Sequence, residues 1–171
     1  MTTLPDNIVG ETIQICVVTR DYKKALEGLT KLGIGPWRVY TFDSETCTNL
    51  TYDGRPADFA MKLCMAFSGS MMWEIVQPTK GRTIYDDFLE AHGEGIHHVA
   101  VDCGGMSWDE RVAHYAERGF KVIQSGKWQG VVPWAYFGTE DATTTTFETF
   151  IIPEDFELPE PEYWYPAAPA D

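Results

Sequence analysis

The stretch that decides the fold runs from Gly95 to Ile123 and reads GIHHVAVDCGGMSWDERVAHYAERGFKVI. It begins with the apolar/polar alternation of a β-strand, passes through a glycine-rich turn, and continues as an amphipathic helix that ends at Gly119. Residues 12–34, TIQICVVTRDYKKALEGLTKLGI, follow the same plan, and their helix ends at Gly33. The chain therefore contains an internal repeat, and each copy opens with a strand followed by a helix.

Strand-like segments follow the helix in each half. They are residues 37–42, 59–67 and 71–76 in the first half, and residues 121–125, 134–137 and 144–152 in the second. The segment 43–58 is rich in Asp, Asn, Thr and Gly, so we expect a loop there that holds at most one irregular strand. Each half thus has the order strand, helix, and then two or three strands.

The composition limits the function classes. The chain has 171 residues, about the length of one domain, with 44% hydrophobic and 23% charged residues, as in globular proteins. Its formal net charge of -13 opposes nucleic-acid binding, because such binding depends on neutralising phosphates. The sequence shows no basic leader before an apolar run and no segment of about 20 apolar residues, so we expect a cytoplasmic protein without a membrane partner. The four cysteines lack CxxC spacing and are expected to be free thiols.

We expect residues 1–153 to form a single domain, with repeat halves at about 10–80 and 94–153, and residues 154–171 to form a tail. From Pro153 onward the chain has five prolines among acidic and aromatic residues, which predicts neither a helix nor a ladder strand. A partly ordered tail that packs a few aromatic side chains onto the domain is the favoured interpretation. A strap across a partner subunit or across the mouth of a pocket is the alternative.

Five motifs in this order resemble the vicinal oxygen chelate superfamily. They are IQICVVTRDYKKAL (13–26), LGIGPWRVY (32–40), WEIVQP (73–78), GEGIHHVAVD (93–102) and TTFETFIIP (145–153). The superfamily includes glyoxalases, methylmalonyl-CoA epimerases, extradiol dioxygenases and antibiotic-sequestering resistance proteins, and the sequence looks most like the epimerase and glyoxalase branches. The resemblance implies an α+β fold in which two βαβββ repeats form a cupped, barrel-like mixed sheet with helices outside. It also implies a homodimer.

The resemblance further implies four metal ligands at repeat-related positions: Gln14, Glu74, His98 and Glu148. Gln14 and His98 occupy equivalent places in the two opening strands, and each glutamate follows an aromatic residue. Side chains alternate along a strand, so His97 is expected on the face opposite to His98. The set suits one divalent ion, namely Zn²⁺, Ni²⁺, Co²⁺, Mn²⁺ or Mg²⁺.

Physical chemistry supports a metal at the two glutamates. Glu74 and Glu148 lie in strands otherwise rich in Met, Trp, Phe and Ile, where an unpaired carboxylate would be costly to bury. Gln14 is equally compatible with a buried polar residue that is satisfied by hydrogen bonds. Because Gln14 stands where the ring-cleaving iron enzymes have a histidine, oxygen-dependent ring cleavage is the less favoured chemistry.

The resemblance implies an isomerase, epimerase or lyase that acts through a metal-stabilised enolate, with Glu148 as the base that moves the proton. Abundant aromatic residues suggest a small apolar or aromatic carbonyl substrate, such as a secondary metabolite. The expected pocket residues are Trp37, Tyr40, Trp73, Trp134 and Tyr136. The alternatives are a glyoxalase-type lyase on a thiol adduct, a ring-cleaving dioxygenase and a non-catalytic small-molecule binder.

Overall fold

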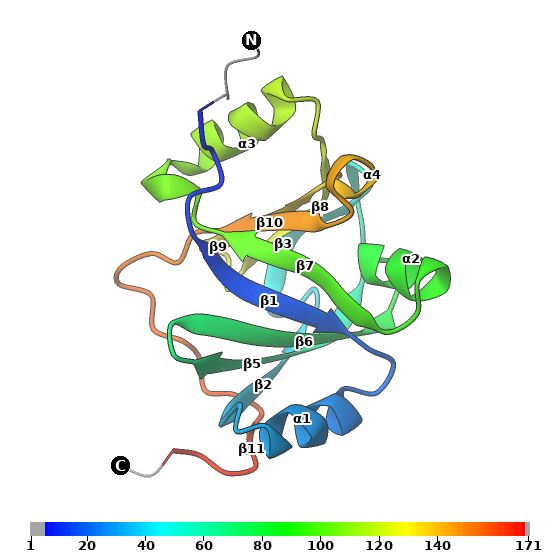
Figure 1. The fold of residues 1–171 in the computed structure, drawn as a ribbon, viewed down its shortest axis with the longest axis vertical. Helices are drawn as coiled ribbons and strands as arrows, with labels where there is room; N and C mark the ends of the chain where they lie inside the picture. The colour runs from blue at the N-terminus through cyan, green and yellow to red at the C-terminus, as the bar shows by residue number, and fades with distance from the viewer. Residues whose placement is uncertain (1–5, 170–171) are drawn as a thin grey trace.

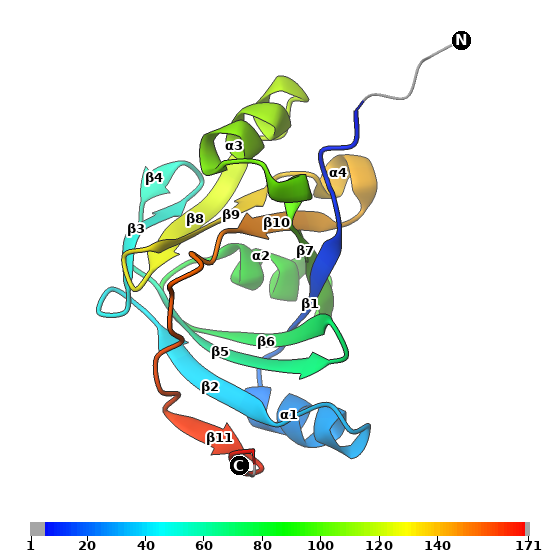
Figure 2. The ribbon, with the colours of Figure 1, turned by 90° about the vertical axis from the view of Figure 1, so that its left-hand side faces the viewer.

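One mixed sheet organises residues 6–169, which are the residues that this computed structural model describes (Figures 1 and 2). The strand order is β11-β2-β5-β6-β1-β7-β10-β9-β8-β3-β4. The strands of the first half are β1 (Thr12–Val18), β2 (Trp37–Phe42), β3 (Cys47–Tyr52), β4 (Arg55–Pro56), β5 (Ala60–Ser68) and β6 (Met71–Lys80). Those that follow are β7 (Gly95–Val101), β8 (Val122–Trp128), β9 (Val132–Phe137), β10 (Thr146–Phe150) and β11 (Tyr163–Tyr165). The sheet curls into an open cup, which confirms the predicted α+β fold.

The internal repeat is visible in the strand pairing. In the first half β1 lies parallel to β6, and in the second half β7 lies parallel to β10. The two halves join at the centre of the sheet, where β1 and β7 run antiparallel (Figure 1). The opening strands of both repeats therefore lie side by side in the middle of the cup.

The segment 43–58 differs from the predicted loop, because it forms the hairpin of β3 and β4. Asp53 and Gly54 make its tight turn, and both have positive φ, as two-residue hairpin turns require. The hairpin pairs with β8, so a strand pair from the first half extends the sheet of the second half. Cys47 and Leu50 anchor it, since both are buried in the main core.

Two helices cover the outer face, as predicted. Helix α1 (Tyr22–Lys31) is capped by Asp21 and packs on the first half, while α3 (Trp108–Glu117) begins with a Ser107–Glu110 capping box and packs on the second. The remaining helical elements are α2 (Ile84–Ala91), a 3₁₀ turn (Cys103–Gly105) and α4 (Glu140–Thr143). No helix within residues 6–169 is long and apolar enough to cross a lipid bilayer.

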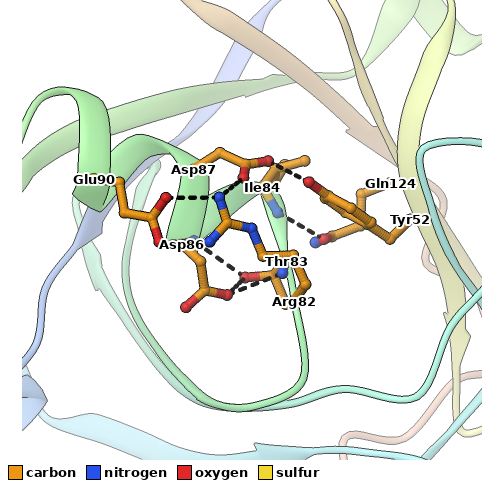
Figure 3. A network of polar contacts seen from close by, with 8 residues as sticks. All are labelled: Tyr52, Arg82, Thr83, Ile84, Asp86, Asp87, Glu90 and Gln124. Atoms are coloured by element: carbon orange, nitrogen blue, oxygen red, sulfur yellow. Dashed lines mark hydrogen bonds and ion pairs between the residues drawn. The ribbon is translucent and has the colours of Figure 1, made fainter.

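Helix α2, which the sequence analysis does not predict, lies between the two half-sheets and carries Tyr85 into the core (Figure 2). A polar network fixes its first turn, as Figure 3 shows. Thr83 and Asp86 form a capping box, and the backbone N–H of Ile84 donates to Oε1 of Gln124 on β8 at 3.1 Å. The hydroxyl of Tyr52 on β3 donates to Asp87 at 2.7 Å. Helix α2 is therefore held by one strand from each half of the chain, β3 and β8.

The C-terminal segment contains a strand, contrary to the prediction. Tyr163 to Tyr165 form β11 and pair antiparallel with β2 at the sheet edge. This three-residue aromatic run holds no proline, so its backbone is free to pair although prolines lie on both sides. Between β10 and β11 the chain crosses from one half-sheet to the other (Figure 2).

Candidate metal centre

Gln14, Glu74, His98 and Glu148 converge at the floor of the cup. Nε2 of His98 lies 3.3 Å from Oε2 of Glu74 and 3.1 Å from Oε2 of Glu148. The amide nitrogen of Gln14 lies 3.3 Å from the same His98 atom and donates to Oε2 of Glu148 at 3.0 Å. All four residues are at most 4% exposed. The structure therefore brings together the four residues that the sequence analysis selects.

Strand register explains the convergence. Cys16, two residues after Gln14, lies opposite Glu74 on β6 and opposite His98 on β7. In the second half Ala100, two residues after His98, lies opposite Glu148 on β10. Residues two apart on a strand share a face, so both opening strands and both closing strands direct their polar side chains to one point.

His97 does not face away from His98, contrary to the alternation. The pairing of β1 with β7 is shifted at this point, because Cys16 lies opposite His98 while Val17 lies opposite Ile96. His97 is the extra residue of this β-bulge, which rotates its side chain toward the same side as His98. Its ring packs against Tyr85 and Phe88 of α2, and its Nδ1 lies 2.8 Å from Nδ1 of His98. A bulge is not encoded in a periodic pattern, so alternation alone misplaces His97.

The electrostatics of the centre favour a cation. Burial lowers the pKa of His98, but Glu148 and Glu74 outweigh burial and raise this pKa to about 9. Burial raises the pKa of Glu148 against the opposing effect of His98. Two buried carboxyl groups therefore share a single imidazole in the protein interior, where unpaired charge is costly.

The donor set fits a divalent metal ion. Oε2 of Glu74 is buried and accepts no hydrogen bond from the described residues. Two carboxylates, one imidazole and one amide are ligands that first-row divalent ions and Mg²⁺ accept, and rotation of the Gln14 amide would present its oxygen. Gln14, Glu74, His98 and Glu148 are therefore the residues that would hold such an ion.

Cys16 also lies at this centre, although the sequence analysis gives it no role. Its sulfur and the donor atoms of Glu74 and His98 all lie within 4.8 Å of one another. The residue is fully buried, and burial, with Glu74 beside it, raises the pKa of the thiol well above its usual range. Its position two residues after Gln14 was the available indication, since both side chains share one face of β1.

The cup above the centre is an apolar cavity. It has a volume of about 640 Å³ including its open mouth. Its lining combines Gln14, Glu74 and Glu148 with the side chains of Phe42, Met61, Leu63, Met65, Phe67, Met72, Trp128, Val132, Trp134, Tyr136, Phe150, Ile152 and Leu158. No Lys or Arg is among these lining residues. The cavity therefore suits a largely apolar ligand with oxygen atoms at one end.

Of the five predicted pocket residues, Trp134 and Tyr136 line the cavity. Trp37 and Trp73 lie on the other face of the sheet and pack in the core beneath α1, where the Trp37 indole donates to the Ile34 carbonyl at 2.8 Å. Tyr40 is not among the lining residues, but its ring packs on Trp128, which is. Aromatic content alone does not tell the inner face from the outer face.

Comparisons with known proteins agree with this architecture. Residues 13–135 match the sequence family described as the glyoxalase/bleomycin resistance protein/dioxygenase superfamily. Methylmalonyl-CoA epimerase from Mycobacterium tuberculosis is similar in structure, with a TM-score of 0.63 and 14% identity over 89% of this chain and 95% of that protein. A hypothetical protein from Bacillus halodurans C-125 has a TM-score of 0.60 and 19% identity over 86% of this chain and 98% of its own. A mutant of 4-hydroxymandelate synthase from Streptomyces coelicolor has a TM-score of 0.60 and 16% identity over 92% of this chain and 42% of that protein. No curated protein sequence matches this chain.

Proposed function

The chain belongs to the glyoxalase/bleomycin resistance protein/dioxygenase superfamily, and from that premise we propose a divalent-metal-dependent isomerase, epimerase or lyase. Its substrate is a small, apolar or aromatic carbonyl compound. The observation that carries the proposal is the group of oxygen donors from Gln14, Glu74 and Glu148 at the floor of an otherwise apolar cavity. A metal ion held there supplies Lewis-acid stabilisation of negative charge on a carbonyl oxygen.

Glu148 is the proposed base. Its carboxylate reaches the cavity, and burial raises its pKa, so it accepts a proton more readily than an exposed glutamate does. It takes a proton from the carbon next to the substrate carbonyl. Return of that proton to the opposite face gives epimerisation, return to a different carbon gives isomerisation, and loss of a neighbouring group gives elimination. Glu74 and His98 remain in place as ligands, and the apolar walls exclude water.

The lining argues for an uncharged substrate body. A methylmalonyl-CoA epimerase of similar fold has been solved in complex with methylmalonyl-CoA, whose coenzyme carries phosphates. In this chain the cavity lining offers no Lys or Arg to such a group, and the whole chain has a net charge of -13. We therefore propose a substrate without an anionic tail.

The test combines metal content with proton exchange. Protein purified without chelator is expected to contain close to one equivalent of divalent metal, and His98→Ala to contain almost none. With trial carbonyl compounds in D₂O, the wild type is expected to introduce deuterium next to the carbonyl. Glu148→Gln is expected to keep its metal, since an amide oxygen and the other ligands remain, while losing that exchange. Less than about a tenth of an equivalent of metal in the wild type contradicts the proposal, because these ligands should hold a first-row ion tightly.

A non-catalytic binder is the second candidate, and the almost entirely apolar lining is the observation that favours it. A binder would take up apolar ligands equally well in wild type and His98→Ala and would catalyse no exchange.

We also propose that the protein acts as a cytoplasmic homodimer. Cys16, Cys47, Cys64 and Cys103 are all free and buried, which suits a reducing compartment. Light scattering after gel filtration tests the dimer, and a molar mass of one chain would contradict it.

A further inference from the structure

We propose that Cys16 is an additional ligand of the metal centre, as a thiolate, and that it makes the centre prefer Zn²⁺ and Co²⁺ over Mg²⁺ and Mn²⁺. This inference rests on the proposed metal site and specifies which class of ion occupies it. It concerns a residue that neither the superfamily resemblance nor the ligand set above includes.

The first support is position. Cys16 lies directly opposite Glu74 on one neighbouring strand and opposite His98 on the other, so its side chain is flanked by both. The donor atoms of the three residues lie within 4.8 Å of one another, a separation that a single ion can bridge. Each is at least nine-tenths buried.

The second support is a buried acceptor that receives no hydrogen bond. Oε2 of Glu74 accepts none from any described residue, although the whole residue is only 4% exposed and Nε2 of His98 lies 3.3 Å away. A metal ion between the carboxylate, the imidazole and the thiol would give this oxygen a close partner.

The third support is the asymmetry of the repeat. The residue equivalent to Cys16 in the second half is Ala100, which lies opposite Glu148 in the same way. The Glu74 side of the centre therefore has a sulfur donor that the Glu148 side lacks. With Cys16 bound on one side, Glu148 remains the carboxylate that is free to exchange a proton with substrate.

Thiolate ligation determines which ions bind well. Sulfur is a soft ligand that favours zinc and its cobalt substitute, whereas magnesium and manganese prefer oxygen. On ligation the S–H bond breaks, the sulfur keeps the electron pair, and one proton passes to the buffer.

Cobalt provides the test. Chelator-treated protein is titrated with Co²⁺ under reducing conditions, and the visible d–d bands and the near-ultraviolet sulfur-to-cobalt charge-transfer band are recorded. In the wild type both are expected to saturate at one equivalent. Cys16→Ala is expected to keep the d–d bands, lose the charge-transfer band and bind Zn²⁺ at least about tenfold more weakly, with Mn²⁺ binding unchanged. Cys64→Ala is the matched control, because Cys64 is also a buried thiol but packs in the core beneath α1, and it should behave as the wild type.

X-ray absorption of the zinc-loaded wild type keeps the proposal testable if Cys16→Ala fails to fold. A zinc–sulfur distance of about 2.3 Å is expected, in addition to shorter bonds to nitrogen and oxygen of about 2.0–2.2 Å. Co²⁺ binding without a charge-transfer band, or a zinc shell of nitrogen and oxygen alone, overturns the role of Cys16 and leaves the proposed function standing. Failure of the wild type to bind either ion instead overturns the proposed function.

Discussion

Nδ1 of His97 lies 2.8 Å from Nδ1 of His98, and the β-bulge between β1 and β7 makes this contact between sequence neighbours. One of the two nitrogens must donate the proton that the other accepts. Burial and the neighbouring His98 ring lower the pKa of His97 well below its usual range, so His97 is neutral. A neutral His97 whose Nδ1 accepts from His98 leaves Nε2 of His98 free for a cation.

His97 therefore positions His98 for metal binding. We expect His97→Phe to weaken Zn²⁺ binding about 10–100-fold, as loss of a partner behind a metal-bound histidine commonly does. His97→Asn, whose side-chain oxygen can accept from His98, should recover part of that affinity. Competition with a chromogenic chelator measures the Zn²⁺ affinity of each variant, and His92→Asn on the surface is the control. Equal losses for Phe and Asn would show that His97 acts through packing alone.

Glu74 is expected to make the metal-free protein less stable, because it is the second buried carboxyl group beside one imidazole, and Glu148 still pairs with His98 when Glu74 is replaced. Without metal, Glu74→Gln should raise the free energy of unfolding by about 1–2 kcal/mol. With saturating Zn²⁺ the wild type should instead be the more stable of the two proteins. A ligand at a thousandfold its Kd stabilises the wild type by about 4 kcal/mol, and it stabilises the variant far less. Urea unfolding with chelator and with zinc measures both values. Glu160→Gln is the control, because Glu160 is exposed and forms no ion pair within residues 6–169. A variant that is less stable than the wild type in chelator would contradict the prediction.

Gly126 makes room for the indole of Trp134 in the cavity wall. A Cβ added at Gly126 would lie 2.5 Å from Cζ2 of Trp134 and 2.9 Å from Cδ2 of Leu50. Gly126→Ala should therefore destabilise the protein by about 1–3 kcal/mol. Gly28→Ala is the opposite case, since a Cβ at Gly28 in α1 meets no atom within 4 Å, and it should stabilise by about 0.5–1 kcal/mol. Urea unfolding measures the change in the free energy of unfolding for both variants. A change of the same sign in the two would refute the steric argument.

Glu162 attaches the C-terminal segment to the sheet. It pairs with Lys62 at 2.5 Å and accepts a hydrogen bond from Thr41, both on neighbouring strands. Burial raises the pKa of Glu162, but these two partners outweigh burial and lower it below its usual range. Its stabilising effect is therefore complete above the ordinary glutamate pKa of about 4.3 and is lost as the pH falls through the lowered value.

We expect Glu162→Gln to speed hydrogen exchange at residues 163–165 relative to the wild type at pH 6, with β9 unaffected. The ratio between variant and wild type should approach one once the pH falls below the lowered pKa of Glu162, because the wild-type carboxyl is then also neutral. Glu160→Gln is the control, since Glu160 is exposed and has no ion pair within residues 6–169. A ratio that does not change with pH would assign the attachment to β11 pairing instead.

The repeat and the outer helices α1 and α3 are readable from the sequence, because each depends on a local period. The four converging residues are identified through the resemblance to the superfamily, and the equivalence between the halves agrees with it. Other features are not readable in this way, and they include α2 and β11. The bulge at His97 and the placement of the hairpin of β3 and β4 depend on pairing between distant segments. The choice of face for Trp37 and Trp73 depends on which side α1 covers, and composition does not encode that side.

The strand pair β3–β4 leaves its own half and completes the sheet of the other. Without this pairing, β8 of the second half and β3 of the first half would each lack a neighbouring strand. Each half would then expose unpaired backbone groups and apolar surface if it formed alone. Folding has to join residues about 75 positions apart before the second half-sheet is complete, since Thr51 pairs with Ser125. The molecule should accordingly unfold in one cooperative transition, and its folding should be slow for its size, as the many distant contacts require.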